Sequence, residues 1–203
     1  MTLANRAFDI FFVLLFLPFL LPAIILVPLA ILILDGRPVL YVSERMNSPK
    51  QGFNLLKFRT MHFDPDDQGV SGGDKEARIT KTGAFLRRYR LDELPQLWNI
   101  FKGDIRFVGP RPPLRHYVEK FPEIYGEVLK SRPGVTGLAT LAYHKTEERL
   151  LSVCETAEET EEVYCRRCVP RKAKLDLIYA QNQTPCTDIH MMCVTMYRKI
   201  PIH

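Results

Sequence analysis

The sequence has few cysteines, and they are not spaced as a disulfide framework. Five cysteines in 203 residues form an odd and irregular set, which favours reduced thiols and a cytosolic environment. The chain also lacks the glycine patterns of a P-loop or a dinucleotide-binding turn, and no serine or cysteine stands in a nucleophile elbow. These absences argue against the common nucleotide-binding folds and against a hydrolase with a catalytic triad.

Acidic residues are fewer than basic ones. There are 23 Asp and Glu against 28 Lys and Arg, which gives a net charge of +5 and a pI of about 9.0. A hydrophobic fraction of 46% is enough for a core and argues against disorder. The length suits one compact domain with a short appendage, and the basic balance predicts an anionic partner: a phosphorylated substrate, an acidic lipid or a nucleic acid.

Charged residues are absent from positions 10–34, a run of 25 residues. A straight helix of that length reaches about 37 Å, and the hydrocarbon core of a bilayer is about 30 Å thick. A secretory signal would have a shorter apolar core and a small-residue cleavage site, and the residues after Leu34 offer no such site. A buried helix of a soluble protein is disfavoured because this segment is apolar all round. We therefore predict a membrane segment over residues 1–36, followed by a separate domain over residues 37–203.

Prolines and flanking charges predict how this segment meets the membrane. Pro18, Pro22 and Pro28 interrupt it, and each removes a helical hydrogen bond, so a kink or a re-entrant bend is expected. Basic residues flank both ends: Arg6 before the segment, and Arg37, Arg45, Lys50 and Lys57 after it. Because positive residues favour the cytoplasmic side, a helix that enters and returns fits better than a simple span.

The rest of the chain alternates strand and helix patterns. Residues 37–47 and 53–61 read as two strands joined by a turn, which places Lys57 and Arg59 on one face and Phe58 in the core. The polar loop over residues 64–74 resembles a calcium-binding loop. Its last ligand position, which requires a bidentate Glu, is Lys75, so a calcium site is excluded. Residues 147–166 are charged and mostly helical in character, and helical or mixed segments follow at 172–181 and 189–200.

An apolar stripe follows Asp92 and Glu93. Leu94, Leu97, Trp98 and Phe101 have helical spacing, and Pro95 fits only in a first turn. A helix is therefore expected to begin near Asp92, with Asp92 or Glu93 as its cap. The structural alternative is that the two acids do nothing more than cap this helix.

These two acids lie in a strongly basic stretch. Residues 78–115 contain nine basic side chains and three acidic ones. A helix N-terminus would keep a carboxylate ionised and would favour a nearby phosphate. An ionised carboxylate can attack phosphorus, Mg²⁺ can offset the repulsion between anions, and arginine can bind phosphate oxygens. The basic set is Arg78, Lys81, Arg87, Arg88, Arg90, Lys102, Arg106, Arg111 and Arg115.

A zinc site is a weaker alternative. Cys165 and Cys168 have the spacing of half a zinc site, and His190 with Cys193, or Cys186, could supply the other half. The pairing is imperfect, so unconnected reduced thiols are the preferred interpretation.

Several blocks of this sequence resemble the bacterial sugar transferase family, the monotopic phosphoglycosyl transferases. The resemblance covers roughly residues 5–197, and the length matches the small form of the family. The blocks are 57–61 (KFRTM), 91–99 (LDELPQLWN), 103–104 (GD), 108–112 (VGPRP), 132–137 (RPGVTG), 175–179 (LDLIY) and 187–189 (TDI).

The resemblance implies a two-step transfer. Asp92 would attack the β-phosphorus of a UDP-sugar, UMP would leave, and polyprenyl phosphate (undecaprenyl phosphate in bacteria) would then take the phosphosugar. Glu93 would help Asp92 to position Mg²⁺ or the incoming phosphate. The phosphates would be held by Lys57, Arg59, Arg87, Arg88 and Arg111.

The resemblance also implies a place in the cell, with residues 37–203 as a cytoplasmic catalytic domain. The enzyme would be monotopic, on the cytoplasmic leaflet of the bacterial inner membrane, with a helix-break-helix whose break we assign to Pro22. The expected fold is α/β (α+β): a small mixed domain with a β-hairpin and amphipathic surface helices. A homodimer is left open.

The sequence departs from the family pattern at two places, after Gly103-Asp104 and after Gly137. These changes leave the chemical core intact and make the identity of the sugar uncertain. The main alternative is an inactive membrane scaffold in a polysaccharide-assembly complex, which the intact Asp92, Glu93 and Arg111 disfavour. A nucleic-acid binder is disfavoured because no recognised binding motif is present.

Overall fold

The computed structural model describes residues 2–62 and 78–197. The loop predicted over residues 64–74, with Lys75, lies outside the described residues. The helices are α1 (Leu3–Leu34), α2 (Lys81–Tyr89), α3 (Gln96–Lys102), α4 (Arg115–Lys120), α5 (Pro122–Val128), α6 (Leu138–Leu151), α7 (Ala157–Val163), α8 (Val169–Gln181) and α9 (Pro185–Tyr197), with a 3-10 turn η2 (Leu91–Glu93) and a π-helical turn η3 (Tyr164–Cys168). The strands are β1 (Leu40–Ser48), β2 (Gln51–Phe58), β3 (Arg106–Val108) and β4 (Gly134–Thr136).

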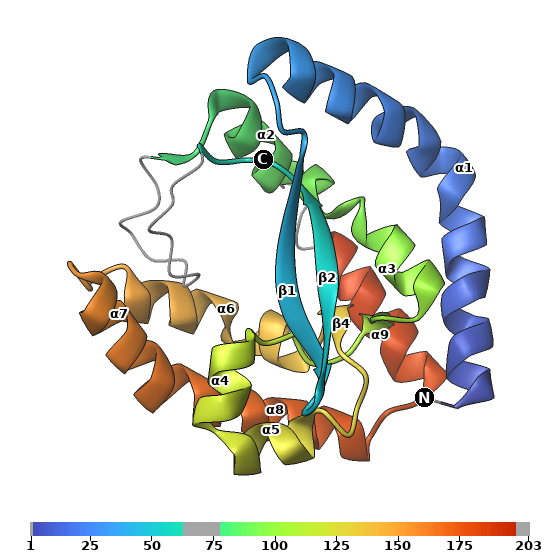
Figure 1. The fold of residues 1–203 in the computed structure, drawn as a ribbon. Helices are drawn as coiled ribbons and strands as arrows, with labels where there is room; N and C mark the ends of the chain where they lie inside the picture. Colours follow the sequence, from blue (N-terminus) through green and yellow to red (C-terminus); the bar gives the residue numbers. More distant parts are fainter. Residues whose placement is uncertain (1, 63–77, 198–203) are drawn as a thin grey trace.

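A long antiparallel hairpin runs through the centre of the molecule (Figure 1). β1 pairs with β2 from Leu40 opposite Phe58 to Ser48 opposite Gln51. The predicted hairpin is confirmed, and Phe58 is buried as expected. β2 ends at Phe58, however, so the strand alternation does not continue to Arg59.

A second, two-stranded sheet is parallel and very short. It pairs β3 with β4, and hydrogen bonds extend the pairing from Gly109 N to Thr136 O (2.8 Å) and from Gly134 N to Pro110 O (2.9 Å). A Cβ atom on Gly134 would lie 2.3 Å from the nitrogen of Gly109, so the two backbones approach this closely only because both residues are glycine. The blocks at 108–112 and 132–137 therefore lie side by side. With two small sheets among helices, the predicted mixed fold class is confirmed.

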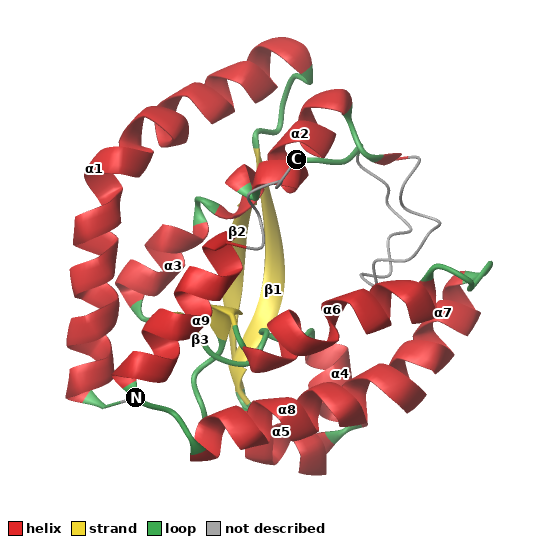
Figure 2. Ribbon diagram, turned by 180° about the vertical axis from the view of Figure 1, so that it is seen from behind, coloured by secondary structure: helices red, strands yellow, loops and turns green. Residues whose placement is uncertain are grey.

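α1 is one continuous helix that bends about half-way along and arcs around the rest of the chain (Figures 1 and 2). Pro18, Pro22 and Pro28 lie inside it, and the hydrogen bonds that they remove give the bend a physical cause. The helix continues through Pro22, and the assignment of a break to that residue stays a prediction.

Only the two ends of α1 are buried against other elements. The buried residues are Asp9 and Val13 near one end and Val27 and Ile31 near the other, and no residue from 14 to 26 is buried. The exposed residues between them are mostly Leu, Ile and Phe. Within the described residues, α1 is the one helix long and apolar enough to cross a membrane.

Three apolar clusters connect these elements. Two of them join β2 to α1: one includes Val13, Phe53 and Ile100, and the other includes Ile31 and Phe58. The third packs the far end of the hairpin against α4, α5 and α8. The core thus holds the hairpin between the membrane-type helix and the C-terminal helices.

A buried ionic network fixes the first half of α1. Arg106 Nε lies 3.0 Å from Asp9 Oδ2, and Arg106 Nη2 lies 3.0 Å from Asp188 Oδ2 on α9. The hydroxyl of Tyr179 donates a hydrogen bond to the other oxygen of Asp188. Arg106, one of the nine basic residues of the central stretch, therefore serves the fold. Removing one partner of such a buried network is strongly destabilising.

The charged segment over residues 147–166 is mostly helical, as predicted, but it is divided. α6 ends at Leu151, and α7 begins after Thr156, whose hydroxyl accepts a hydrogen bond from Glu159 N at 3.1 Å. This is an N-cap, and it starts a new helix.

Candidate active site

The two candidate catalytic acids lie in η2, between α2 and α3. The chain leaves α2 through Arg90, whose φ of 58° is left-handed. Asp92 and Glu93 follow at once, and both are buried, with 7% and 9% of their surfaces exposed.

The prediction that one of these acids caps the next helix is wrong. α3 begins at Gln96, with Pro95 at the cap position and no side-chain cap bond. Pro95 thus stands at the start of the helix, where no helical hydrogen bond requires its missing N–H. Leu94 N instead donates to Leu91 O at 3.2 Å, in the i→i+3 pattern of a 3-10 turn.

Asp92 has a buried oxygen without a partner. Its Oδ1 makes no hydrogen bond within the described residues. Burial raises the pKa of Asp92 and so does the neighbouring Glu93, while Lys57, Arg90 and Arg87 act in the opposite direction. The prediction that a helix N-terminus keeps this carboxylate ionised is not supported, because Asp92 lies in a 3-10 turn and its burial favours the neutral form.

Glu93 is held between two cations. Its Oε1 lies 3.5 Å from Lys57 Nζ, and its Oε2 lies 3.3 Å from Arg90 Nη2. Burial and the charge of Arg111 lower the pKa of Lys57 to about 8, although Glu93 and Asp92 oppose the shift. Lys57 is therefore a cation that can lose its proton just above neutral pH.

Asn99 on α3 fixes the edge of β2 beside these acids. Its Oδ1 accepts from Leu56 N at 3.0 Å, and its Nδ2 donates to Asn54 O at 2.8 Å and to Asp104 Oδ2 at 3.0 Å. The side chain thus pairs with the strand as another backbone would. Because Leu56 precedes Lys57, this contact sets where the lysine stands relative to η2.

Arg111 is placed by the proline-rich segment that follows β3. Met46 N on β1 donates to Pro113 O at 2.9 Å, and Arg45 Nη1 donates to Pro112 O at 3.4 Å. Proline cannot supply an N–H, so this segment can pair with β1 only through its carbonyl groups. The contacts bring Arg111 next to Arg45.

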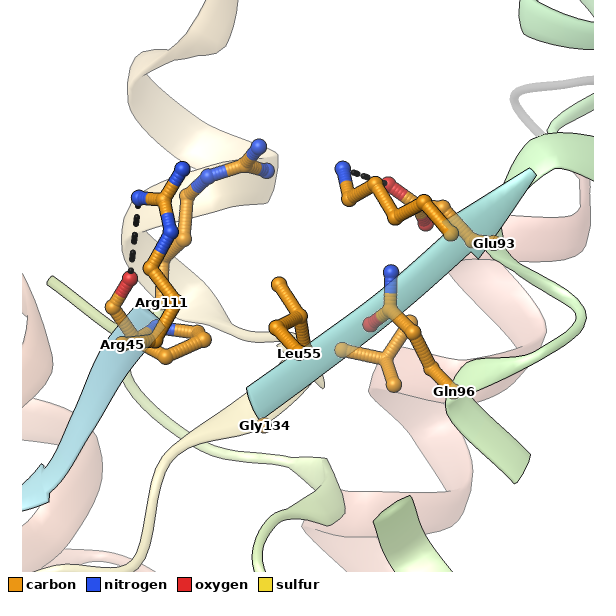
Figure 3. A pocket seen from close by; sticks show the side chains of 9 residues that line it. Arg45, Leu55, Glu93, Gln96, Arg111 and Gly134 are labelled. Atoms are coloured by element: carbon orange, nitrogen blue, oxygen red, sulfur yellow. Dashed lines mark hydrogen bonds and ion pairs between the residues drawn. The ribbon is translucent and has the colours of Figure 1, made fainter. Parts of the chain in front are cut away.

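These elements border a shallow pocket that is partly open to solvent. Figure 3 shows the side chains of Arg45 and Arg111 on one side and that of Glu93 across the space from them. Lys57 also lines the pocket, and its Nζ lies 3.5 Å from Glu93 Oε1. Three cations and one carboxylate thus face the same volume. The pocket is lined by Arg45, Leu55, Lys57, Glu93, Gln96, Arg111, Pro112, Gly134 and Val135.

Three of the five predicted phosphate-binding residues do not line this pocket. Arg59 donates to Asp35 O at 2.6 Å and to Gly36 O at 2.9 Å, at the end of α1. Arg87 lies on the Asp92 side and donates to Thr60 Oγ1 at 2.9 Å. Arg88 is exposed on α2, beside the ring of Tyr89. Lys57 and Arg111 are the two that the structure brings together.

The whole chain matches one family. The model of the bacterial sugar transferase family covers residues 1–200. The chain belongs to this family.

Several relatives of this chain are named for the transfer of sugar phosphates to undecaprenyl phosphate. A Bacillus subtilis protein with the provisional name undecaprenyl-phosphate N-acetylgalactosaminyl 1-phosphate transferase is 40% identical over 118 residues, which is 58% of this chain and 66% of the relative. The undecaprenyl-phosphate glucose phosphotransferase of Komagataeibacter xylinus is 32% identical over 98% of this chain and 36% of its own length. The UDP-glucose:undecaprenyl-phosphate glucose-1-phosphate transferase of Caulobacter vibrioides is 36% identical over 68% of this chain and 53% of its own length. The chain thus spans between about a third and two thirds of these relatives.

The structure adds three residues to the candidate site. Arg45 and Gln96 line the pocket, and Arg90 pairs with Glu93. In the sequence, Arg45 stands out only as a charge that flanks the apolar segment, and Arg90 only as one member of a basic stretch. Gln96 belongs to the block at 91–99, so its position could have been chosen, but no local pattern assigns its role.

The donor set fits a magnesium ion better than a zinc ion. Asp92 offers a buried oxygen without a partner, and Glu93 is its neighbour. Mg²⁺ typically takes one or two carboxylates and completes its shell with water and substrate phosphates. Among the described residues, no three His, Cys, Asp or Glu side chains are placed to hold a metal, and Cys165 donates instead to Glu161 at 3.2 Å. The zinc alternative with Cys168, His190, Cys193 or Cys186 is therefore not supported.

Proposed function

We propose that this chain transfers a sugar 1-phosphate from a UDP-sugar to a polyprenyl phosphate such as undecaprenyl phosphate, giving a polyprenyl-diphosphate sugar and UMP. The observation that carries the proposal is a buried carboxylate pair, Asp92 and Glu93, beside a pocket with three cations. The names of the relatives supply the two substrates. Such a step would be the first membrane step in building an exopolysaccharide or another glycan.

In the first half-reaction Asp92 acts as the nucleophile. One carboxylate oxygen bonds to the β-phosphorus of the UDP-sugar, and the bond from that phosphorus to the bridging oxygen breaks. The electron pair goes to the UMP phosphate, which leaves. The product on the protein is an acyl phosphate that carries the sugar. In the second half-reaction an oxygen of polyprenyl phosphate attacks the same phosphorus, and the Asp92 carboxylate is released.

Cations make the approach of one anion to another feasible. Mg²⁺, held by Asp92 and Glu93, would neutralise charge on the phosphates. Lys57 and Arg111 bind phosphate oxygens from opposite sides of the pocket. Glu93 keeps Lys57 in place through their 3.5 Å ion pair. Arg87, near Asp92, supports the ionised carboxylate.

We also propose that the protein is monotopic, on the cytoplasmic face of the inner membrane, with α1 entering and leaving on one side. Arg6 donates to Ile100 O at 2.6 Å and to Phe101 O, and Arg59 donates to Asp35 O and Gly36 O. Both ends of α1 are therefore bound to the same domain. A spanning helix would separate its ends by the thickness of the bilayer, so this arrangement supports the re-entrant course.

The test is UMP release by detergent-solubilised protein with Mg²⁺, undecaprenyl phosphate and a panel of UDP-sugars. We expect UMP and lipid-linked sugar from the wild type, no turnover by Asp92→Asn, and normal turnover by Glu148→Gln, which changes an exposed acid on α6. Normal turnover by Asp92→Asn would overturn the mechanism. Folded wild-type protein that binds UDP-sugars but releases no UMP would favour the inactive scaffold.

A further inference from the structure

Arg45 lines the pocket, and the hydrogen bonds of its side chain go to uncharged groups. Its Nε donates to Ser43 Oγ at 3.2 Å, and its Nη1 donates to Pro112 O at 3.4 Å. Both acceptors are neutral, so neither balances the guanidinium charge. Figure 3 shows the guanidinium group beside that of Arg111, on the wall that faces Glu93.

The wall of the pocket formed by Arg45 and Arg111 carries an excess of positive charge. Glu93 is the one carboxylate in the lining, and it is paired with Lys57 and Arg90. Within the part of the chain that the structure describes, neither Arg45 nor Arg111 forms an ion pair with an acid. Burial lowers the pKa of Arg45 to about 10, and the charge of Arg111 contributes to the fall. Two neighbouring guanidinium groups of this kind favour a bound anion.

We propose that Arg45 and Arg111 form one phosphomonoester subsite that serves both half-reactions, the phosphate of UMP in the first and the phosphate of the polyprenyl lipid in the second. The inference rests on the proposed function. Arg45 would be a further substrate-binding residue of the transfer.

The position of this wall supports a shared subsite. Phosphoryl transfer places the attacking and leaving oxygens roughly in line through phosphorus. Glu93 lies across the pocket from the two arginines. Lys57 pairs with Glu93 and also interacts with the charge of Asp92, so the reacting phosphorus is expected on that side. UMP must then leave toward the arginines.

The second half-reaction repeats this geometry in reverse. Asp92 is now the leaving group, so the lipid phosphate must attack from the side that UMP vacated. No proton transfer is needed, because UMP leaves with its extra negative charge and the lipid phosphate attacks as an anion. Two planar guanidinium groups can bind a terminal phosphate of either molecule bidentately, whatever the group attached to it. The two substrates must therefore occupy the subsite in turn.

Binding of UMP is the first test, since it requires no turnover. We expect Arg45→Gln to weaken UMP binding about 10- to 100-fold, the usual range for a hydrogen bond to a charged group. Arg45→Lys should lose less, because it keeps the charge but not the fork. Arg149→Gln, which removes an exposed arginine on α6, should bind UMP as the wild type does. Unchanged UMP affinity in folded Arg45→Gln would overturn the proposal.

A second experiment, with polyprenyl phosphate as the substrate, tests whether the lipid phosphate uses the same subsite as UMP. Starting from protein that already carries the phosphosugar, UMP should compete with polyprenyl phosphate, and Arg45→Gln should raise the KM for the lipid by a similar factor. A fall in UMP affinity with an unchanged lipid KM would overturn the shared subsite.

A measurement on the wild type covers the case in which Arg45→Gln does not fold. Phenylglyoxal modifies arginine, and UMP should slow labelling of Arg45 and Arg111 at least 10-fold while Arg149 is labelled at the same rate. Unprotected Arg45 would overturn the subsite. If UMP protects Arg45 but no UDP-sugar is turned over, the subsite stands and the proposed function fails.

Discussion

The depressed pKa of Lys57 predicts an alkaline limit to activity. The pKa falls from 10.5 to about 8 because Lys57 is desolvated and faces Arg111. The protonated form binds phosphate, so activity should be lost as pH rises through about 8. At pH 9 about one lysine in ten would still carry its proton, whereas an ordinary lysine would be almost fully charged.

The assay is kcat/KM for the UDP-sugar in the first half-reaction, measured as UMP release without lipid, from pH 6 to pH 9.5. This parameter reports groups of the free enzyme, and leaving out the lipid removes the titration of its phosphate. We expect a fall of about tenfold per pH unit above pH 8. At the acid end, activity should fall as pH drops through the raised pKa of Asp92, since the carboxylate is the nucleophile.

Two variants identify the titrating group. Lys57→Arg keeps a cation opposite Glu93 and should move the alkaline limb beyond pH 9. Lys130→Arg is the matched control: Lys130 is 69% exposed and pairs only with Glu127 within the described residues, so its profile should match the wild type. A wild-type profile that is flat to pH 9.5, or an unchanged limb in Lys57→Arg, would refute this reasoning.

Three further predictions concern packing, metal and membrane. Gly134→Ala places a Cβ atom 2.3 Å from Gly109 N and should lower the free energy of unfolding by about 1–3 kcal/mol. The control Gly126→Ala, inside α5, meets nothing within 4 Å and should raise the free energy of unfolding by about 0.5–1 kcal/mol. Thermal unfolding measures both variants, and equal melting temperatures would contradict the close approach of Gly134 to Gly109. Removal of divalent cations by a chelator should abolish UMP release and Mg²⁺ should restore it; full activity in excess chelator would rule out the proposed role of magnesium. Trp98 and Phe101 stack on each other and are exposed on α3, so replacing both with Ser should weaken vesicle binding, measured by flotation, and unchanged flotation would show that this face does not contact lipid.

The elements with strong local signals could be predicted from the sequence. Alternating residues on both sides of Pro49 and Lys50 are enough to indicate the hairpin, because its register is set by a short turn. The charge-free run likewise predicts α1, and its prolines predict the bend. The acid pair was also identified from the sequence, since it stands out in a basic stretch.

The local geometry of the acid pair could not be predicted from the apolar stripe. Leu91, Leu94 and Leu97 are spaced by three, which suits a 3-10 turn as well as one face of an α-helix. The structure has the 3-10 turn from Leu91 to Glu93 and the α-helix from Gln96. Pro95 is compatible with either start, since the first turn of a helix does not use its N–H, so the sequence alone does not choose between them.

Long-range partners account for the residues that were missed or misplaced. Arg45 is 67 positions from Pro112, and its role depends on how the proline-rich segment meets β1. Arg59 was grouped with Lys57 by strand alternation, but β2 ends one residue earlier and the guanidinium reaches back to the carbonyls that end α1. Neither contact leaves a local signal in the sequence.

The central claim is that Asp92 carries the phosphosugar between two half-reactions. The most direct measurement is the intact mass of the protein after incubation with a turned-over UDP-sugar and Mg²⁺ but without lipid, followed by peptide mapping. We predict an added mass of one sugar phosphate on the peptide that contains Asp92, its loss on addition of polyprenyl phosphate, and no adduct on Asp92→Asn. UMP release with no adduct at Asp92, under conditions in which the protein is stable, would contradict the account.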